Sequence, residues 1–105
     1  MEKLPNIHPG EILNEEFLKP LKISAYRISK ETKMPYARIL GILKERGRIT
    51  ADTALRLSKF FGTTPDFWLG LQAEYDLRKE KELKFQEINS IHTFQHINMA
   101  HNSMI

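Results

Sequence analysis

Three consecutive residues, Tyr36, Ala37 and Arg38, have side chains suited to contacting the edges of DNA bases. An arginine fork can donate to O6 and N7 of guanine together, which makes Arg38 the best candidate for direct base recognition. Tyr36 can contact a phosphate or a base edge, and Ala37 is small enough to touch a thymine methyl. The alternative for Tyr36 is that its ring packs on the domain.

Further basic residues lie on both sides of this triplet. Those that follow it are expected to contact phosphates, which position a protein on DNA without specifying sequence: Lys44, Arg46 and Arg48. Arg27 and Lys30 precede it and are also expected near the DNA backbone. The competing interpretation is a solvated basic surface, which is as good an explanation for Lys30 and for Arg56.

Two short helices separated by a tight break must position these side chains. The first is predicted over residues 24–31, the break over 32–34, and the second from Pro35 to about residue 43. Ser24 is a good N-cap, and Pro35 suits the first position of a helix. Two helices joined in this way are typical of a helix-turn-helix, whose second helix can enter the major groove. If Lys33 is left-handed, it carries a cost of about 1 kcal/mol that glycine avoids.

The flanking segments predict a helical scaffold. One helix is expected to begin at Pro9 and to end before Pro20. After a turn at Gly47, Thr50 caps a further helix that stops at Gly62, and its buried side is predicted to comprise Ala51, Ala54, Leu55, Leu57, Ser58, Phe60 and Phe61. The fold prediction is an all-α domain of five helices over residues 8–78, with an N-terminal arm at 1–7 and a charged helical extension and tail at 79–105.

The helix expected after Thr64 is apolar on more than one side, which predicts that its second side is buried within the protomer or across a dimer. The predicted dimer seam is Phe67, Trp68, Leu71 and Tyr75, although Phe67 and Trp68 also suit the core. The run at residues 78–84 is interpreted as a solvated face that extends this helix, with a Glu80–Lys84 pair. Beyond residue 86, a marginal amphipathic helix and disorder remain alternatives, the helix depending on Ile88, Ile91, Phe94 and Ile97.

Composition excludes several classes of protein. The chain has 105 residues, a net charge of +3 and no cysteine, so disulfides and thiolate chemistry are excluded. No N-terminal apolar segment resembles a signal peptide, and no apolar run approaches the ~18 residues that span a bilayer. No nucleophile motif or phosphate-binding glycine loop occurs, and the His92/His96 pair lacks a third metal ligand. We therefore expect a soluble, cytoplasmic, non-enzymatic protein without metal or cofactor.

Three segments, HPGEIL, ITADTALRL and FGTTPDFWL, carry a specific likeness to a known family. Over residues 7–78 the chain resembles the HigA (VapI) antitoxins of the lambda-repressor-like, XRE class. The resemblance implies a repressor that binds its own promoter as a homodimer and neutralises a HigB-type mRNA-endonuclease toxin. Some relatives have no toxin, so a stand-alone regulator is the alternative. The chain departs from the wider class at Ala25, Thr32 and Lys33, where glutamine, an apolar residue and glycine are common.

Overall fold

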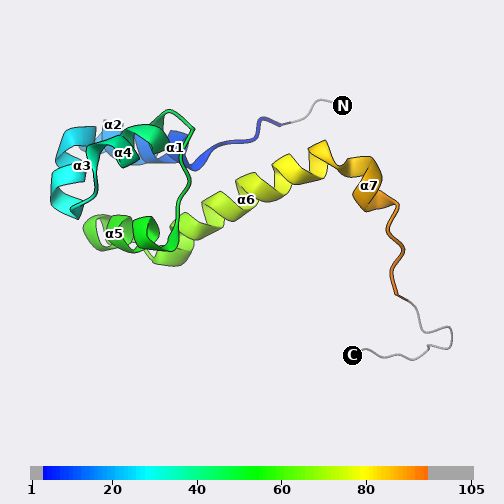
Figure 1. Ribbon diagram of the computed structural model, residues 1–105. Coiled ribbons are helices and arrows are strands. Elements are labelled where there is room, and N and C mark those ends of the chain that lie inside the picture. Colours follow the sequence, from blue (N-terminus) through cyan, green and yellow to red (C-terminus); the bar gives the residue numbers. More distant parts are fainter. Residues whose placement is uncertain (1–3, 95–105) are drawn as a thin grey trace.

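The computed structural model describes residues 4–94, and these form helices joined by short loops, with no strand among them (Figure 1). The all-α fold is thereby confirmed. Because α1, η1 and α2 are contiguous and count as one helix, the described residues contain the five predicted helices followed by a short sixth. The elements in chain order are α1 (Pro9–Ile12), η1 (Leu13–Leu18), α2 (Lys19–Leu21), α3 (Ala25–Thr32), α4 (Tyr36–Leu43), α5 (Ala51–Phe61), α6 (Pro65–Leu83) and α7 (Phe85–Asn89).

The segments α1, η1 and α2 form one continuous helical run. Pro9 is its first residue, as predicted, and the His8 side chain caps it by accepting from the Gly10 N–H at 2.9 Å. The prediction that Pro20 ends this helix is wrong, because the helix continues to Leu21. Just before Pro20 the helix is of the π type, in which the Lys19 N–H bonds five residues back. This wider turn relieves the clash that a proline ring makes with a preceding α-helical turn.

The helix-turn-helix consists of α3 and α4. Ser24 caps α3 by accepting from the Arg27 N–H at 3.0 Å. The turn has Lys33 in the left-handed region at φ 57°, so a lysine occupies the conformation that usually favours glycine. Pro35 is the N-cap of α4 rather than its first helical residue, because its ψ of 138° is extended. The predicted start of this helix was therefore one residue early.

One hydrophobic core fixes α4 against the rest of the domain. Ile28 of α3 and Ile39 and Ile42 of α4 all point inward and are fully buried. Burial of side chains of this size contributes roughly 1.5–3 kcal/mol each. Gly10 lets α1 approach α4 closely, because a Cβ at this position would lie 1.9 Å from the Ile42 carbonyl oxygen. The other fully buried large residues of this core are Leu13, Leu57 and Trp68.

Helix α5 is capped as predicted but buries a narrower side. Thr50 accepts from the Thr53 N–H, and Gly62 ends the helix at φ 76°. Ala54, Leu57 and Ser58 are buried, whereas Ala51 is exposed and Leu55 is 58% exposed. The prediction for Ala51 and Leu55 was wrong because α5 covers the core with one side only.

Helix α6 begins in the domain and continues well beyond it (Figure 1). Thr64 caps it, Pro65 is its first residue, and the charged run extends it with the predicted Glu80–Lys84 pair at 3.2 Å. The N-terminal arm is attached to this helix by Arg78, which donates to the Leu4 carbonyl at 2.6 Å.

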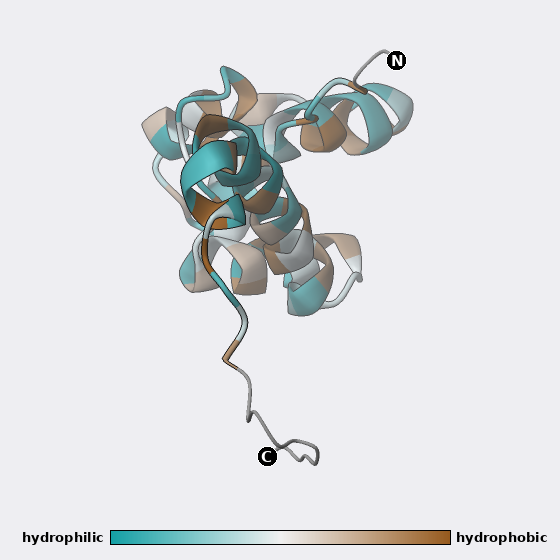
Figure 2. Ribbon diagram, turned by 90° about the vertical axis from the view of Figure 1, so that its right-hand side faces the viewer, coloured by the Kyte–Doolittle hydropathy of each residue, from teal (hydrophilic) through white to brown (hydrophobic). Residues whose placement is uncertain are grey.

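The short helix α7 follows α6, and hydrophobic ribbon lies beside polar ribbon at this end of the molecule (Figure 2). Of the predicted amphipathic set, Ile88 lies on α7, while Ile91 and Phe94 are exposed after it. Ile97 and the rest of residues 95–105 lie outside the described part of the chain.

Candidate nucleic-acid interface

The N-terminal end of α4 is an exposed tip on the domain surface. Tyr36, Ala37 and Arg38 are all exposed there, in the helix that the core holds rigidly through its opposite side. The Tyr36 ring packs edge-to-face on Tyr26 of α3, with 5.9 Å between centroids, and still leaves 45% of the residue exposed. The Tyr36 ring therefore packs on the domain, as the alternative interpretation predicted, and keeps an accessible side, while its contact with DNA stays a prediction.

Helix α3 carries two basic residues, of which Lys30 is next to the tip through Tyr26. The Lys30 ammonium lies 5.5 Å from the centroid of the Tyr26 ring, and Arg27 is 3.8 Å from the Glu31 carboxylate on the same helix. Both basic side chains are exposed. Both therefore remain accessible to a polyanion.

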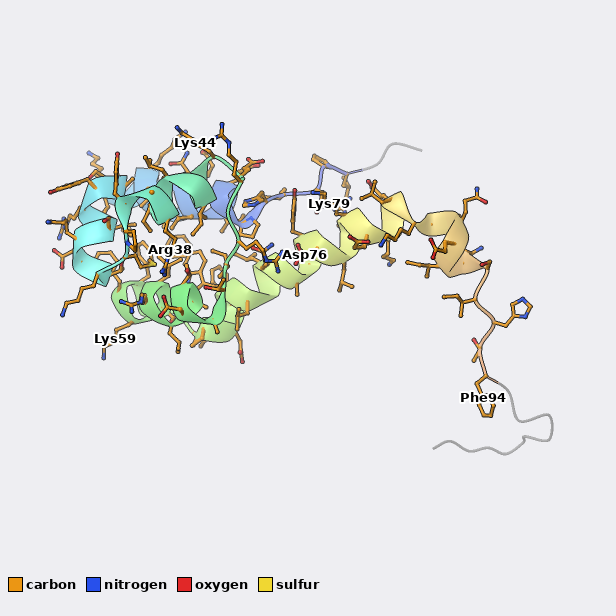
Figure 3. All side chains as sticks on the ribbon, viewed as in Figure 1. Arg38, Lys44, Lys59, Asp76, Lys79 and Phe94 are labelled. Atoms are coloured by element: carbon orange, nitrogen blue, oxygen red, sulfur yellow. The ribbon has the colours of Figure 1, made fainter. Side chains whose placement is uncertain are left out.

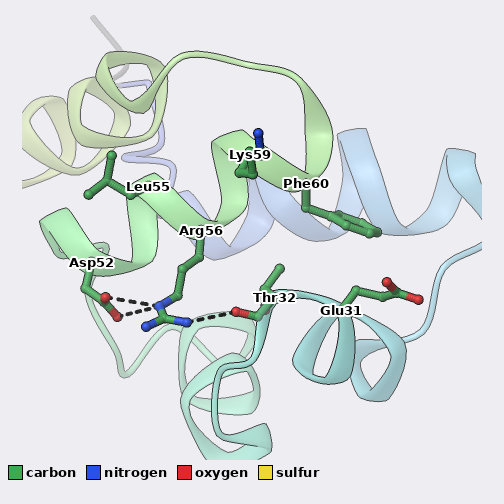
Figure 4. Close-up of a pocket in the computed structure, with 7 residues that line it drawn as sticks. All are labelled: Glu31, Thr32, Asp52, Leu55, Arg56, Lys59 and Phe60. Atoms are coloured by element: carbon green, nitrogen blue, oxygen red, sulfur yellow. Dashed lines mark hydrogen bonds and ion pairs between the residues drawn. The ribbon is translucent and has the colours of Figure 1, made fainter.

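Arg38 is held by a carboxylate of the next helix. Its Nη1 donates to Oδ2 of Asp52 at 2.6 Å, between α4 and α5 (Figure 3). Asp52 also accepts from Nε of Arg56 at 3.0 Å, and Nη1 of Arg56 donates to the Thr32 carbonyl at 3.1 Å (Figure 4). The hydrogen bond from Arg38, and then that from Arg56, holds the pKa of the Asp52 carboxyl below its usual value. Arg56 is thus part of the domain's own bonding, which favours a structural role for it.

The loop after α4 carries two exposed basic residues, Lys44 and Arg46. Glu45 is its left-handed residue, at φ 62°, and the bend at Gly47 follows. The N–H groups of Arg46 and Gly47 both bond to the Gly41 carbonyl at 2.9 Å, which fixes the loop against α4. Lys44 and Arg46 are exposed, and neither forms an ion pair within residues 4–94. Figure 3 shows Lys44 at the opposite end of α4 from the tip.

Arg48 differs from its two neighbours in the loop, because both of its terminal nitrogens reach Asp76 of α6, at 3.3 and 2.9 Å. Its hydrogen bond is the main cause of a lowered pKa at the Asp76 carboxyl and of a raised pKa at Arg48 itself. Beside this pair, the buried Gln72 accepts from the Ile49 N–H at 2.7 Å and donates to Asp76 at 3.1 Å. Arg48 therefore attaches the loop to α6.

The sequence interpretation did not single out three residues that organise this surface: Asp52, Gln72 and Asp76. Each belongs to a pair four residues apart on one helix face, Asp52 with Arg56 and Gln72 with Asp76. That spacing was a readable signal. The pairing of Asp52 with Arg38 and of Asp76 with Arg48 depends on the tertiary fold and was not readable.

The residues of the predicted dimer seam are not equally accessible. Trp68 is fully buried in the protomer, where its Nε1 donates to Thr63 at 2.7 Å, so the core alone accounts for it. Phe67 is 39% exposed, while Leu71 and Tyr75 are half-buried. Tyr75 meets the His8 ring edge-on at a centroid distance of 4.9 Å. A partner can therefore reach Phe67 and the outer sides of Leu71 and Tyr75, but not Trp68.

Within residues 4–94, no three metal-binding side chains gather into a group. His92 belongs to this part of the chain, whereas His96 lies outside the described residues. None of the described helices is both long and apolar enough to cross a membrane.

Comparison with known proteins identifies the family of this chain. No protein-family model matches the chain. Virulence-associated protein I of Dichelobacter nodosus is 47% identical over 89 residues, which are 85% of this chain and 82% of that protein. The chain belongs to the HigA (VapI) family.

Two solved HigA structures have the same fold. An addiction-module antidote protein of the HigA family from Coxiella burnetii matches with a TM-score of 0.81 and 44% identity, over 87% of this chain and 100% of that one. Pseudomonas aeruginosa antitoxin HigA, solved with the higBA promoter, matches with a TM-score of 0.82 and 35% identity, over 86% and 99%. Other relatives are named only as HTH-type transcriptional regulators. This HigA-family chain is therefore a helix-turn-helix DNA-binding protein of the antitoxin and repressor type.

Proposed function

We propose that this HigA-family chain is a sequence-specific repressor that places α4 in the major groove of an operator in its own promoter. The observation that carries the proposal is the exposed tip of α4, where Arg38 lies on a helix fixed by the core. Arg38 supplies the base-reading fork, and the exposed Lys44 and Arg46 supply positive charges for phosphates. Arg27 and Lys30 add positive charge beside Tyr36.

The proposed repressor is a homodimer on a palindromic operator. A dimer places two recognition helices about 34–36 Å apart, one turn of DNA, so that each half-site meets one α4. The proposed seam lies on α6 and uses Phe67 with the outer sides of Leu71 and Tyr75. The proposed DNA-binding domain spans residues 8–78. Since α6 continues through residue 78, the extension is continuous with that domain.

The partner that we propose is a HigB-type mRNA-endonuclease toxin, which this chain neutralises as its antitoxin. The HigA names of its relatives support this half of the proposal. The N-terminal helical run and the C-terminal segment are the candidate toxin-binding surfaces. A stand-alone regulator is the second candidate, and the relatives named only as transcriptional regulators favour it.

Substitution of Arg38 by alanine tests the DNA half of the proposal in a gel-shift titration on the palindrome upstream of the gene. We expect a loss of about 1–3 kcal/mol in binding free energy and a relaxed base preference at one position of each half-site. Lys59→Ala is the matched control, because it removes one positive charge from an exposed residue of α5 (Figure 3). Unchanged affinity and base preference in Arg38→Ala would refute the role of α4.

Expression of the adjacent open reading frame tests the toxin half. An antitoxin requires a neighbour that arrests growth when expressed alone and is rescued by this chain. A harmless neighbour, or none, would instead establish the stand-alone regulator.

A further inference from the structure

We infer that Asp52 is a positioning residue for base recognition, which holds the Arg38 guanidinium by one nitrogen and leaves its other donor edge free for guanine. The inference rests on the proposed function, because it assigns Arg38 to a base edge. It adds a specificity-determining residue on α5, outside the helix-turn-helix itself.

The geometry of the pair separates the donors of Arg38 into two groups. Nη1 is engaged, by Asp52 at 2.6 Å and more distantly by Thr53 Oγ1 at 3.5 Å. Nε and Nη2 have no hydrogen-bond partner within residues 4–94. These two nitrogens form the edge that presents two parallel N–H groups, which is the pattern that O6 and N7 of guanine accept. Asp52 therefore holds Arg38 without consuming the donors that a guanine needs.

Asp52 can serve as an anchor because it is fixed from its other side. Nε of Arg56 lies 3.0 Å from both carboxylate oxygens of Asp52. Nη1 of Arg56 in turn donates to the carbonyl of Thr32 at 3.1 Å, where α3 ends (Figure 4). It also donates to the carbonyl of Lys33 at 3.2 Å. The turn of the helix-turn-helix is thus connected through Arg56 and Asp52 to the guanidinium at the tip of α4.

Fixing Arg38 before DNA arrives reduces the side-chain freedom that binding must otherwise remove. The side chains of Arg38 and Asp52 are 38% and 51% exposed, so the pair lies at the surface where a ligand can reach it. The negative charge of Asp52 also repels phosphates in general. Loss of that charge must therefore have two separable effects: stronger binding to any DNA, and weaker discrimination between the operator and altered sequences.

The experiment compares Asp52→Asn, Arg38→Ala and the double variant in fluorescence-anisotropy titrations. The probes are the upstream palindrome and a set of palindromes with symmetric single-base substitutions. The matched control is Asp66→Asn, because Asp66 occupies the second position of α6 as Asp52 does in α5 and is likewise exposed. We expect Asp52→Asn to reduce discrimination about tenfold at the position that Arg38 reads. Asp66→Asn should leave it unchanged.

The double variant makes the result decisive. If Asp52 acts through Arg38, Asp52→Asn causes no further loss of discrimination once Arg38 is alanine. A loss of equal size in the Arg38→Ala background, or unchanged discrimination in Asp52→Asn alone, overturns the inference and leaves the proposed function intact. Absence of salt-dependent, sequence-specific binding by the unaltered chain would overturn both. Circular-dichroism melting of each variant detects unfolding directly. A loss of discrimination that comes from unfolding would also persist in the double variant, whereas a loss that acts through Arg38 would not.

Discussion

Two arginine–aspartate pairs lie around α4, and they differ in what supports the aspartate. Arg38 of α4 meets Asp52 of α5 at 2.6 Å, and Arg48 of the following loop meets Asp76 of α6 at 2.9 Å. Behind Asp76 is the buried Gln72, which also satisfies a buried backbone N–H. Behind Asp52 is the partly exposed Arg56, which bonds to the end of α3.

This difference indicates different uses of the same pair of residue types. A buried polar group that loses its partner costs more free energy of folding than an exposed ion pair contributes. The pair of Arg48 and Asp76, which rests on the buried Gln72, is therefore coupled to the stability of the fold. The pair of Arg38 and Asp52 is exposed and contributes mainly by fixing the direction of the Arg38 side chain. Changes on the two sides should therefore separate stability from DNA recognition.

The largest effect is expected from Gln72→Ala. The substitution leaves the Ile49 N–H buried without its acceptor, so we expect the free energy of unfolding to fall by about 1–3 kcal/mol. Chemical denaturation measures the change. Gln86→Ala, at an exposed position of α7, is the matched control and should leave stability unchanged. Equal stability of the two variants would show that the Gln72 contact does not support the loop.

A second effect, on DNA affinity, is expected from the paired substitution Lys44→Ala and Arg46→Ala. Both side chains are exposed and unpaired within residues 4–94, so each is free to release a counterion from a phosphate. We expect weaker binding to all sequences alike. The slope of log affinity against log salt concentration is negative, and we expect its magnitude to decrease by about 2. The matched control removes two exposed lysines elsewhere, Lys59→Ala and Lys81→Ala. An unchanged salt slope in the loop variant would exclude phosphate contacts by this loop.

Local signals in the sequence predicted the fold well. Ser24, Thr50 and Thr64 cap helices as their residue types indicate, because a cap depends only on backbone groups two or three residues away. The continuation of the first helix through Pro20 was not predictable in the same way. It depends on a π turn that single-residue preferences do not reveal.

The arrangement of the site was predicted less completely. Exposure of Tyr36, Ala37 and Arg38 followed from their position at the start of α4. What holds Arg38 did not follow, because its partner is 14 residues further along the chain and meets it only when α4 and α5 pack. Leu55 shows the same limit, since an apolar residue type does not tell which sides of α5 are covered.

The smallest effects are expected in acid titrations of the two aspartates. Their folded-state pKa values lie below the usual 3.8, chiefly through Arg38 for Asp52 and through Arg48 for Asp76. A lowered pKa means that each pair stabilises the fold above the unfolded-state pKa, which is close to the usual 3.8, and that this contribution is lost as the pH falls through the folded-state pKa. Carboxyl ¹³C NMR should show the pKa of Asp76 rising in Arg48→Ala and that of Asp52 rising in Arg38→Ala. Because Arg56 still donates to both carboxylate oxygens of Asp52, the pKa of Asp52 should nevertheless stay below its usual value in this variant. A return of Asp52 to 3.8 in Arg38→Ala would show that Arg56 does not hold it.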